Sequence, residues 1–116
     1  MRLDVIQMMS SIEDYCRRQF MGAHEANSCM LLVEELVASR LVEAARERGI
    51  DEPQIHVELS SGEGGVGASL MLDYRHLYEA VGNVMDLGDE ISGMLVKSLV
   101  KSTDDDGHGK TRFVIR

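Results

Sequence analysis

Two polar side chains interrupt an apolar helical pattern in the string LLVEELVASRLVEAA, residues 31–45. Glu35 and Ser39 are four residues apart, so both side chains project from nearly the same face of a helix, one turn apart. A carboxylate can accept a proton as a general base, and a hydroxyl oxygen can ligate Mg²⁺. The alternative is structural: Glu35 belongs to a solvated helix face and pairs with Arg40 or His24, while Ser39 bonds to the carbonyl four residues earlier.

A second candidate group is Asp73, near the end of the apolar stretch 68–74. A carboxylate at this position, where a strand gives way to a turn, can accept a hydrogen bond from a ligand. Its structural alternative is turn formation with Tyr74 and Arg75.

Other suggestive strings fit a structural role better. The string GEGGVG joins two predicted strands, whereas a phosphate-binding glycine loop must open a helix, so we interpret it as a hairpin turn. The string GHGKT resembles the end of a P-loop but lacks the first glycine, and the acidic DDDGHG lacks the later carboxylates of a calcium loop. Both are interpreted as a solvated turn. The four histidines form no metal-ligand spacing.

The periodicity of apolar residues predicts which elements hold these groups. A spacing of three or four residues predicts helices, and the alternation in the string IHVEL predicts a half-buried strand. The predicted elements are helix 5–20, helix 24–48 ended by Gly49, strands 55–59 and 68–74, an irregular segment or broken helix 75–89, helix 90–102, an acidic turn, and strand 111–115. This order predicts an α+β fold, a two-layer sandwich with helices on one face of a mostly antiparallel sheet.

Composition limits the classes of protein to consider. A chain of 116 residues has the size of one domain, so we expect a single domain over residues 1–116. The net charge of −8 disfavours nucleic acid as a partner. The chain contains neither an apolar run long enough to cross a bilayer nor a signal-peptide core, which predicts a cytoplasmic protein without membrane attachment.

Taken together, the VEELV string, the later LVKSLV string and the terminal RFVIR strand occur in an order that resembles the GHKL ATPases, which include gyrase, heat-shock chaperones and histidine kinases. The resemblance is greatest to the small bacterial anti-sigma-factor serine kinases and covers nearly the whole chain. It implies a reduced histidine-kinase-like ATPase fold. It also implies that Glu35 is the general base, that Ser39 replaces the asparagine that holds Mg²⁺, and that Asp73 accepts the adenine amino hydrogen.

The sequence departs from the nucleotide-binding boxes of that family. After Asp73 the two glycine positions of the second box are Arg75 and Leu77. The two glycine positions of the phosphate-wrapping box are Glu90 and Ser92, and a carboxylate repels phosphate. Gly93 lies one residue after that box and is, with Asp73, the remaining candidate for cofactor contact.

The resemblance therefore implies a regulatory protein-binding module, similar to an anti-sigma factor, in which ATP binding is weakened or lost. Its expected partner is a sigma factor or an anti-anti-sigma-like domain, and a homodimer is also implied. We expect neither catalysis nor a bound cofactor. Two alternatives stay open: an active serine kinase or ATPase that uses ATP and Mg²⁺, and a small α+β interaction domain unrelated to this family.

Overall fold

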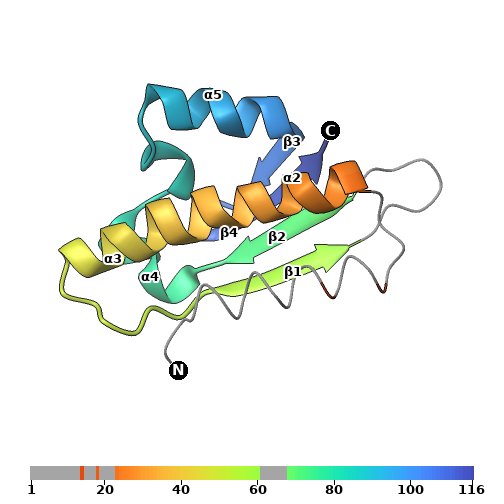
Figure 1. The fold of residues 1–116 in the computed structure, drawn as a ribbon. Helices are drawn as coiled ribbons and strands as arrows, with labels where there is room; N and C mark the ends of the chain where they lie inside the picture. Colours follow the sequence, from red (N-terminus) through yellow and green to blue (C-terminus); the bar gives the residue numbers. More distant parts are fainter. Residues whose placement is uncertain (1–13, 15–17, 19–22, 61–67) are drawn as a thin grey trace.

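One long helix crosses the sheet in the computed structural model, which describes residues 14, 18, 23–60 and 68–116 (Figure 1). It consists of α2 (Ala23–Val33), the π-helical segment η1 (Glu34–Val42) and α3 (Glu43–Glu47). Gly49 ends the helix with a φ of 76°, and the N–H groups of Gly49 and Ile50 donate to the carbonyls of Arg46 and Ala45. This is a Schellman cap, so both the predicted helix 24–48 and its glycine cap are confirmed.

The first predicted helix, 5–20, lies almost entirely outside the described residues. Only Asp14 and Arg18 of that segment are described, and both are helical and exposed. Their exposure agrees with the charged face that the sequence predicts for this helix.

Four strands form one antiparallel sheet in the order β1-β2-β4-β3. The predicted pairing of strands 55–59 and 68–74 is confirmed, because β1 pairs with β2 along its length and Val57 faces Leu72. The string GEGGVG, interpreted as the turn between them, lies outside the described residues. Along β2 and β4, buried and more exposed residues alternate, as the period of a strand requires. The bounds of the strands are β1 His56–Ser60, β2 Ser69–Asp73, β3 Val100–Asp105 and β4 Lys110–Ile115.

The core lies between the long helix and one face of the sheet (Figure 1). Leu36 and Leu41 of the helix and Leu70, Leu72 and Phe113 of the sheet have no exposed surface. Each such side chain contributes about 1.5–3 kcal/mol of hydrophobic stabilisation. The predicted α+β class, with helices on one face of an antiparallel sheet, is therefore confirmed.

In the described part of the chain, the segment between β2 and β3 supplies further helices. It contains α4 (Arg75–Val81), a single 3-10 turn η2 (Val84–Asp86) and α5 (Glu90–Leu99), so the predicted broken helix over 75–89 is confirmed. None of the helices in the described part of the chain is both long and apolar enough to span a membrane.

The predicted end of the last helix was wrong. The sequence predicts helix as far as Ser102, but α5 ends at Leu99 and the chain continues directly into β3. The reason is tertiary: Thr103 pairs with Phe113 and Asp105 pairs with Thr111, which gives the backbone of β3 hydrogen-bond partners that a longer helix would forgo.

The acidic string after β3 forms the predicted turn. The Asp106 carboxylate accepts hydrogen bonds from the backbone N–H groups of His108 and Lys110, at 2.7 and 3.0 Å. These bonds lower the pKa of Asp106 below its ordinary value, because they stabilise its charged form. The carboxylate thus orders the turn between β3 and β4.

Candidate functional site

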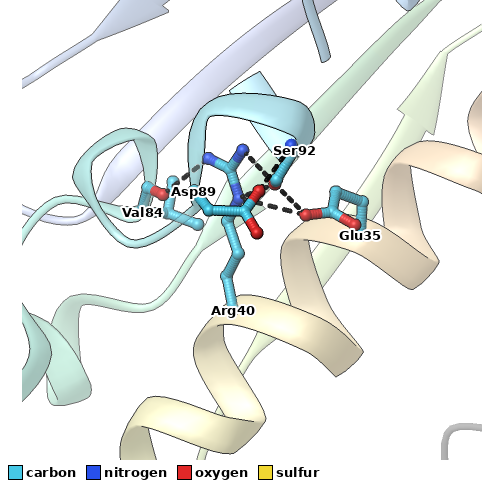
Figure 2. Close-up of polar contacts among 5 residues, drawn as sticks. All are labelled: Glu35, Arg40, Val84, Asp89 and Ser92. Carbon is cyan, nitrogen blue, oxygen red and sulfur yellow. Dashed lines mark hydrogen bonds and ion pairs between the residues drawn. The ribbon is translucent and has the colours of Figure 1, made fainter. Parts of the chain in front are cut away.

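The π-helical segment of the long helix sets the geometry of the candidate site. Hydrogen bonds between residues five apart widen this part of the helix. Glu35 and Arg40 are five residues apart, and the wider turn places both side chains toward α5 (Figure 2). Such segments are uncommon in proteins and recur at functional sites.

Arg40 is the centre of the site. Its side chain is only 3% exposed. Its Nη1 donates to the Val84 carbonyl at 3.0 Å, and its Nη2 and Nε donate to the Ser92 hydroxyl at 2.6 and 3.1 Å. One guanidinium therefore joins the long helix to η2 and to α5, as Figure 2 shows.

Glu35 completes the network. Its Oε1 lies 3.5 Å from Arg40 Nε and accepts a hydrogen bond from the Ser92 hydroxyl. A serine hydroxyl has one proton to donate and two lone pairs to accept with. The Ser92 hydroxyl therefore donates its one proton to Glu35 and accepts two hydrogen bonds from Arg40, so it has no further hydrogen bond to make. The pairing of Glu35 with Arg40 is one of the alternatives that the sequence leaves open, and the geometry confirms it.

Asp89 occupies the N-terminus of α5. Its Oδ1 accepts the backbone N–H of Ser92 at 2.8 Å, which is an N-cap. A carboxylate at this end interacts favourably with the helix dipole. Ser92 is therefore held through its backbone by Asp89 and through its side chain by Arg40 and Glu35, so the start of α5 is fixed against the long helix.

The hydroxyl group of Tyr74 also holds the η2 turn in place. The Val84 N–H donates to the Tyr74 hydroxyl at 2.8 Å, while the Val84 carbonyl accepts from Arg40. Burial raises the pKa of Tyr74 above its ordinary value, although the hydrogen bond from Val84 opposes this rise. Tyr74 is therefore neutral at physiological pH and serves as a structural hydroxyl.

Gly88 lets the guanidinium approach the backbone. A Cβ at this position would lie 2.4 Å from Arg40 Nη2 and 2.5 Å from Ser92 Oγ, closer than atoms can pack. A side chain at this position would therefore require Arg40 or Ser92 to move.

An open cavity of about 510 Å³ lies beside this network. Two of the residues singled out from the sequence, Glu35 and Ser39, line it from the long helix, and Ser39 is exposed. The other wall comes from α5 and the segment before it, with Leu87, Gly88, Asp89, Ile91, Ser92 and Leu95. The structure therefore brings Glu35 and Ser39 together, as their spacing predicts.

Asp73 lies elsewhere. It pairs with His56 and Lys110 across the sheet, and because neighbouring Leu72 points into the core, Asp73 faces the opposite side. Its carboxylate lines a separate cavity of about 320 Å³. Among the described residues, Glu35 and Asp73 therefore line two separate cavities.

The Asp73 carboxylate instead forms a turn. Arg75 donates to it from its backbone at 3.3 Å and from its guanidinium at 3.1 and 3.0 Å. Partial burial raises the pKa of Asp73, but the bonds and charge of Arg75, with the charge of Lys110, outweigh burial and lower it below the ordinary value. The structural alternative of a turn formed with Arg75 is confirmed.

Gly93 lies within α5 and lines neither cavity. A Cβ on Gly93 would meet no atom within 4 Å, so no close approach requires a glycine there. Within the described ranges, no three His, Cys, Asp or Glu side chains gather in a way that could hold a metal ion.

Comparison of the chain with models of known families, with curated proteins and with solved structures finds no match. The geometry of the site, together with the resemblance of its motifs, is therefore the ground for a functional proposal.

Two glycines of this region provide a matched test of the network. We expect Gly88→Ala to lower the free energy of unfolding by about 1–3 kcal/mol, because Arg40 must release Ser92 to make room. Gly93→Ala should leave stability unchanged or raise it by up to about 1 kcal/mol, since alanine is the better helix former. Urea unfolding of both variants measures this. A Gly88→Ala variant as stable as the unaltered protein would contradict the described packing.

Proposed function

We propose that this chain is a regulatory protein-binding module, similar to an anti-sigma factor, in which ATP binding is weakened or lost. The observation that carries the proposal is the engagement of the Glu35 carboxylate by Arg40 and Ser92 inside the protein. A general base must be within hydrogen-bond reach of the proton it removes and have a lone pair to receive it. The Glu35 oxygen nearest the network already serves two internal donors.

The phosphate side of a nucleotide site is also occupied by the chain's own groups. Helix N-termini bind phosphate through free N–H groups. At α5 the Asp89 carboxylate already accepts the Ser92 N–H, and Glu90 follows it on the surface. An incoming phosphate would have to displace one carboxylate and approach a second, which Coulomb repulsion opposes. This arrangement supports the loss of ATP binding.

The outer face of α5 supports a protein partner. Ile91 is 79% exposed, Met94 66% and Leu95 36%. Single exposed apolar residues are ordinary, but adjacent ones on one helix face mark interaction sites. The cavity beside Glu35 opens at this same face, because Ile91 and Leu95 also line it.

By the resemblance, the partner is a sigma factor or an anti-anti-sigma-like domain, met in the cytoplasm, and the module itself can form a homodimer. Nucleic acid is a poor candidate because the net charge is −8. Because the proposed module has weakened or lost ATP binding, ATP and Mg²⁺ have no part in the proposed mechanism. The protein acts by binding rather than by phosphate transfer.

Calorimetric titration with Mg-ATP tests the nucleotide half of the proposal. We expect no saturable binding at micromolar concentrations, since Arg40, Ser92 and Asp89 already use the polar groups of the site. The outcome that would restore an active kinase or ATPase is micromolar affinity that Glu35→Ala or Asp73→Ala abolishes.

Site-specific photo-crosslinking in the source cells tests the partner half. A crosslinker placed at Ile91 or Met94 should give a covalent adduct containing a sigma factor or an anti-anti-sigma-like domain, because both side chains are exposed on α5. The same crosslinker at Glu58, an exposed residue on the other side of the sheet, is the control. Equal adducts from all three positions, or none, would contradict the proposal.

A further inference from the structure

Apolar side chains of α5 line part of the cavity beside Glu35, and further exposed apolar side chains lie on α5 and on the long helix. In Figure 1, α5 runs alongside the long helix on the same side of the sheet. Ile91 and Leu95 are one turn apart on α5 and line the cavity, and Met94 extends the same face. Leu31, 44% exposed, lies one turn before Glu35 on the long helix. We call the cavity wall formed by Ile91 and Leu95, together with the exposed side chains of Met94 and Leu31, the α5 groove.

The rim of the α5 groove is acidic. Asp89 lines the cavity, and the exposed Asp86 and Glu90 lie within three residues of it in the sequence. Glu34, also exposed, precedes Glu35 on the long helix. Arg40 also lines the cavity, but it is buried and bonded to Glu35, so it does not offset this rim. On α5 itself the basic residue is Lys97, two turns further along the helix. The end of the groove near Asp89 therefore carries negative charge that no exposed neighbour on α5 balances.

This charge decides between possible occupants. A second copy of the chain would place one acidic rim against another, and an anionic membrane surface would be repelled in the same way. A segment with apolar side chains at helical spacing and Lys or Arg at one end can place its apolar side chains on the groove and its positive charges beside the carboxylates of the rim. Amphipathic helices are recognised in grooves by this pattern of anchors.

We propose that the α5 groove binds an amphipathic helix of a partner protein, with its basic end over Asp89 and Glu90. The inference rests on the proposed function, and it adds the chemical class of the ligand. At about 1.5 Å per residue, the ten residues of α5 match about three turns of such a helix. Two or three apolar side chains at positions i, i+3 or i+4 and i+7 contact Ile91, Met94 and Leu95.

Two fluorescent peptides test this inference directly. Both are amphipathic helices of about 16 residues with the same leucine positions, long enough to populate helix in water. One carries Lys and Arg on its polar positions, and the other carries Glu. Fluorescence anisotropy with the full chain should show the basic peptide binding at least about tenfold more tightly.

Variants assign the binding to the groove. Ile91→Asp and Met94→Asp should each weaken the basic peptide by about tenfold or more, because both positions are exposed and lie in the contact. Glu90→Lys should reduce the preference for the basic peptide, whereas the matched exposed change Glu58→Lys should not. Each variant is checked for unchanged thermal unfolding.

The inference would be overturned if neither peptide binds or if the acidic peptide binds more tightly. It would also be overturned if the affinity for the basic peptide is unchanged in the Ile91→Asp and Met94→Asp variants and is lost when salt is added. Stronger binding to anionic vesicles than to the basic peptide would assign the groove to a membrane instead. If crosslinks from Ile91 persist while the peptide test fails, the protein-binding function stands and only the helix assignment falls. If the crosslinks fail as well, both fall.

Discussion

The structure depends on one buried positive charge. Among the described residues, Arg40 is the only charged residue that is buried. Removing such a group from water costs several kcal/mol unless its partners are arranged around it. The partners here are the Val84 carbonyl of η2, the Ser92 hydroxyl of α5 and the Glu35 carboxylate of the long helix itself. Satisfying this one guanidinium therefore fixes how η2 and α5 sit against the long helix.

The same constraint connects stability with the proposed function. A nucleotide at this place would need a free carboxylate, a free helix N-terminus and space beside the backbone. Glu35 is instead paired with Arg40, Asp89 caps α5, and the Arg40 guanidinium fills the space beside Gly88. α5 buries Val96 in the core but leaves other apolar residues on its surface, where Ile91 and Met94 meet solvent. The proposed loss of phosphate binding and the proposed protein-binding surface thus rest on one arrangement.

Local sequence patterns predicted the elements that depend on interactions between residues close in the sequence. The long helix and its glycine cap, the hairpin and the last strand follow from periodicity and cap residues. The strand β3 does not, because it exists through pairing with β4. The hydrogen bonds of Arg40 to Ser92 and Val84 could not be predicted from local patterns either, because these partners lie 52 and 44 residues away in the sequence. The orientation of Asp73 could be predicted from the sequence, because a strand that buries Leu70 and Leu72 directs the Asp73 side chain to the opposite face of the sheet.

Hydrogen exchange of an Arg40→Met variant tests the central claim most directly. If Arg40 fixes η2 and α5, the amides of residues 84–99 should exchange at least about tenfold faster than in the unaltered protein, because their opening no longer breaks the buried contacts. Amides in the paired strands β2 and β4 should keep more of their protection. Unchanged protection across residues 84–99, in a variant confirmed to be folded, would contradict the account.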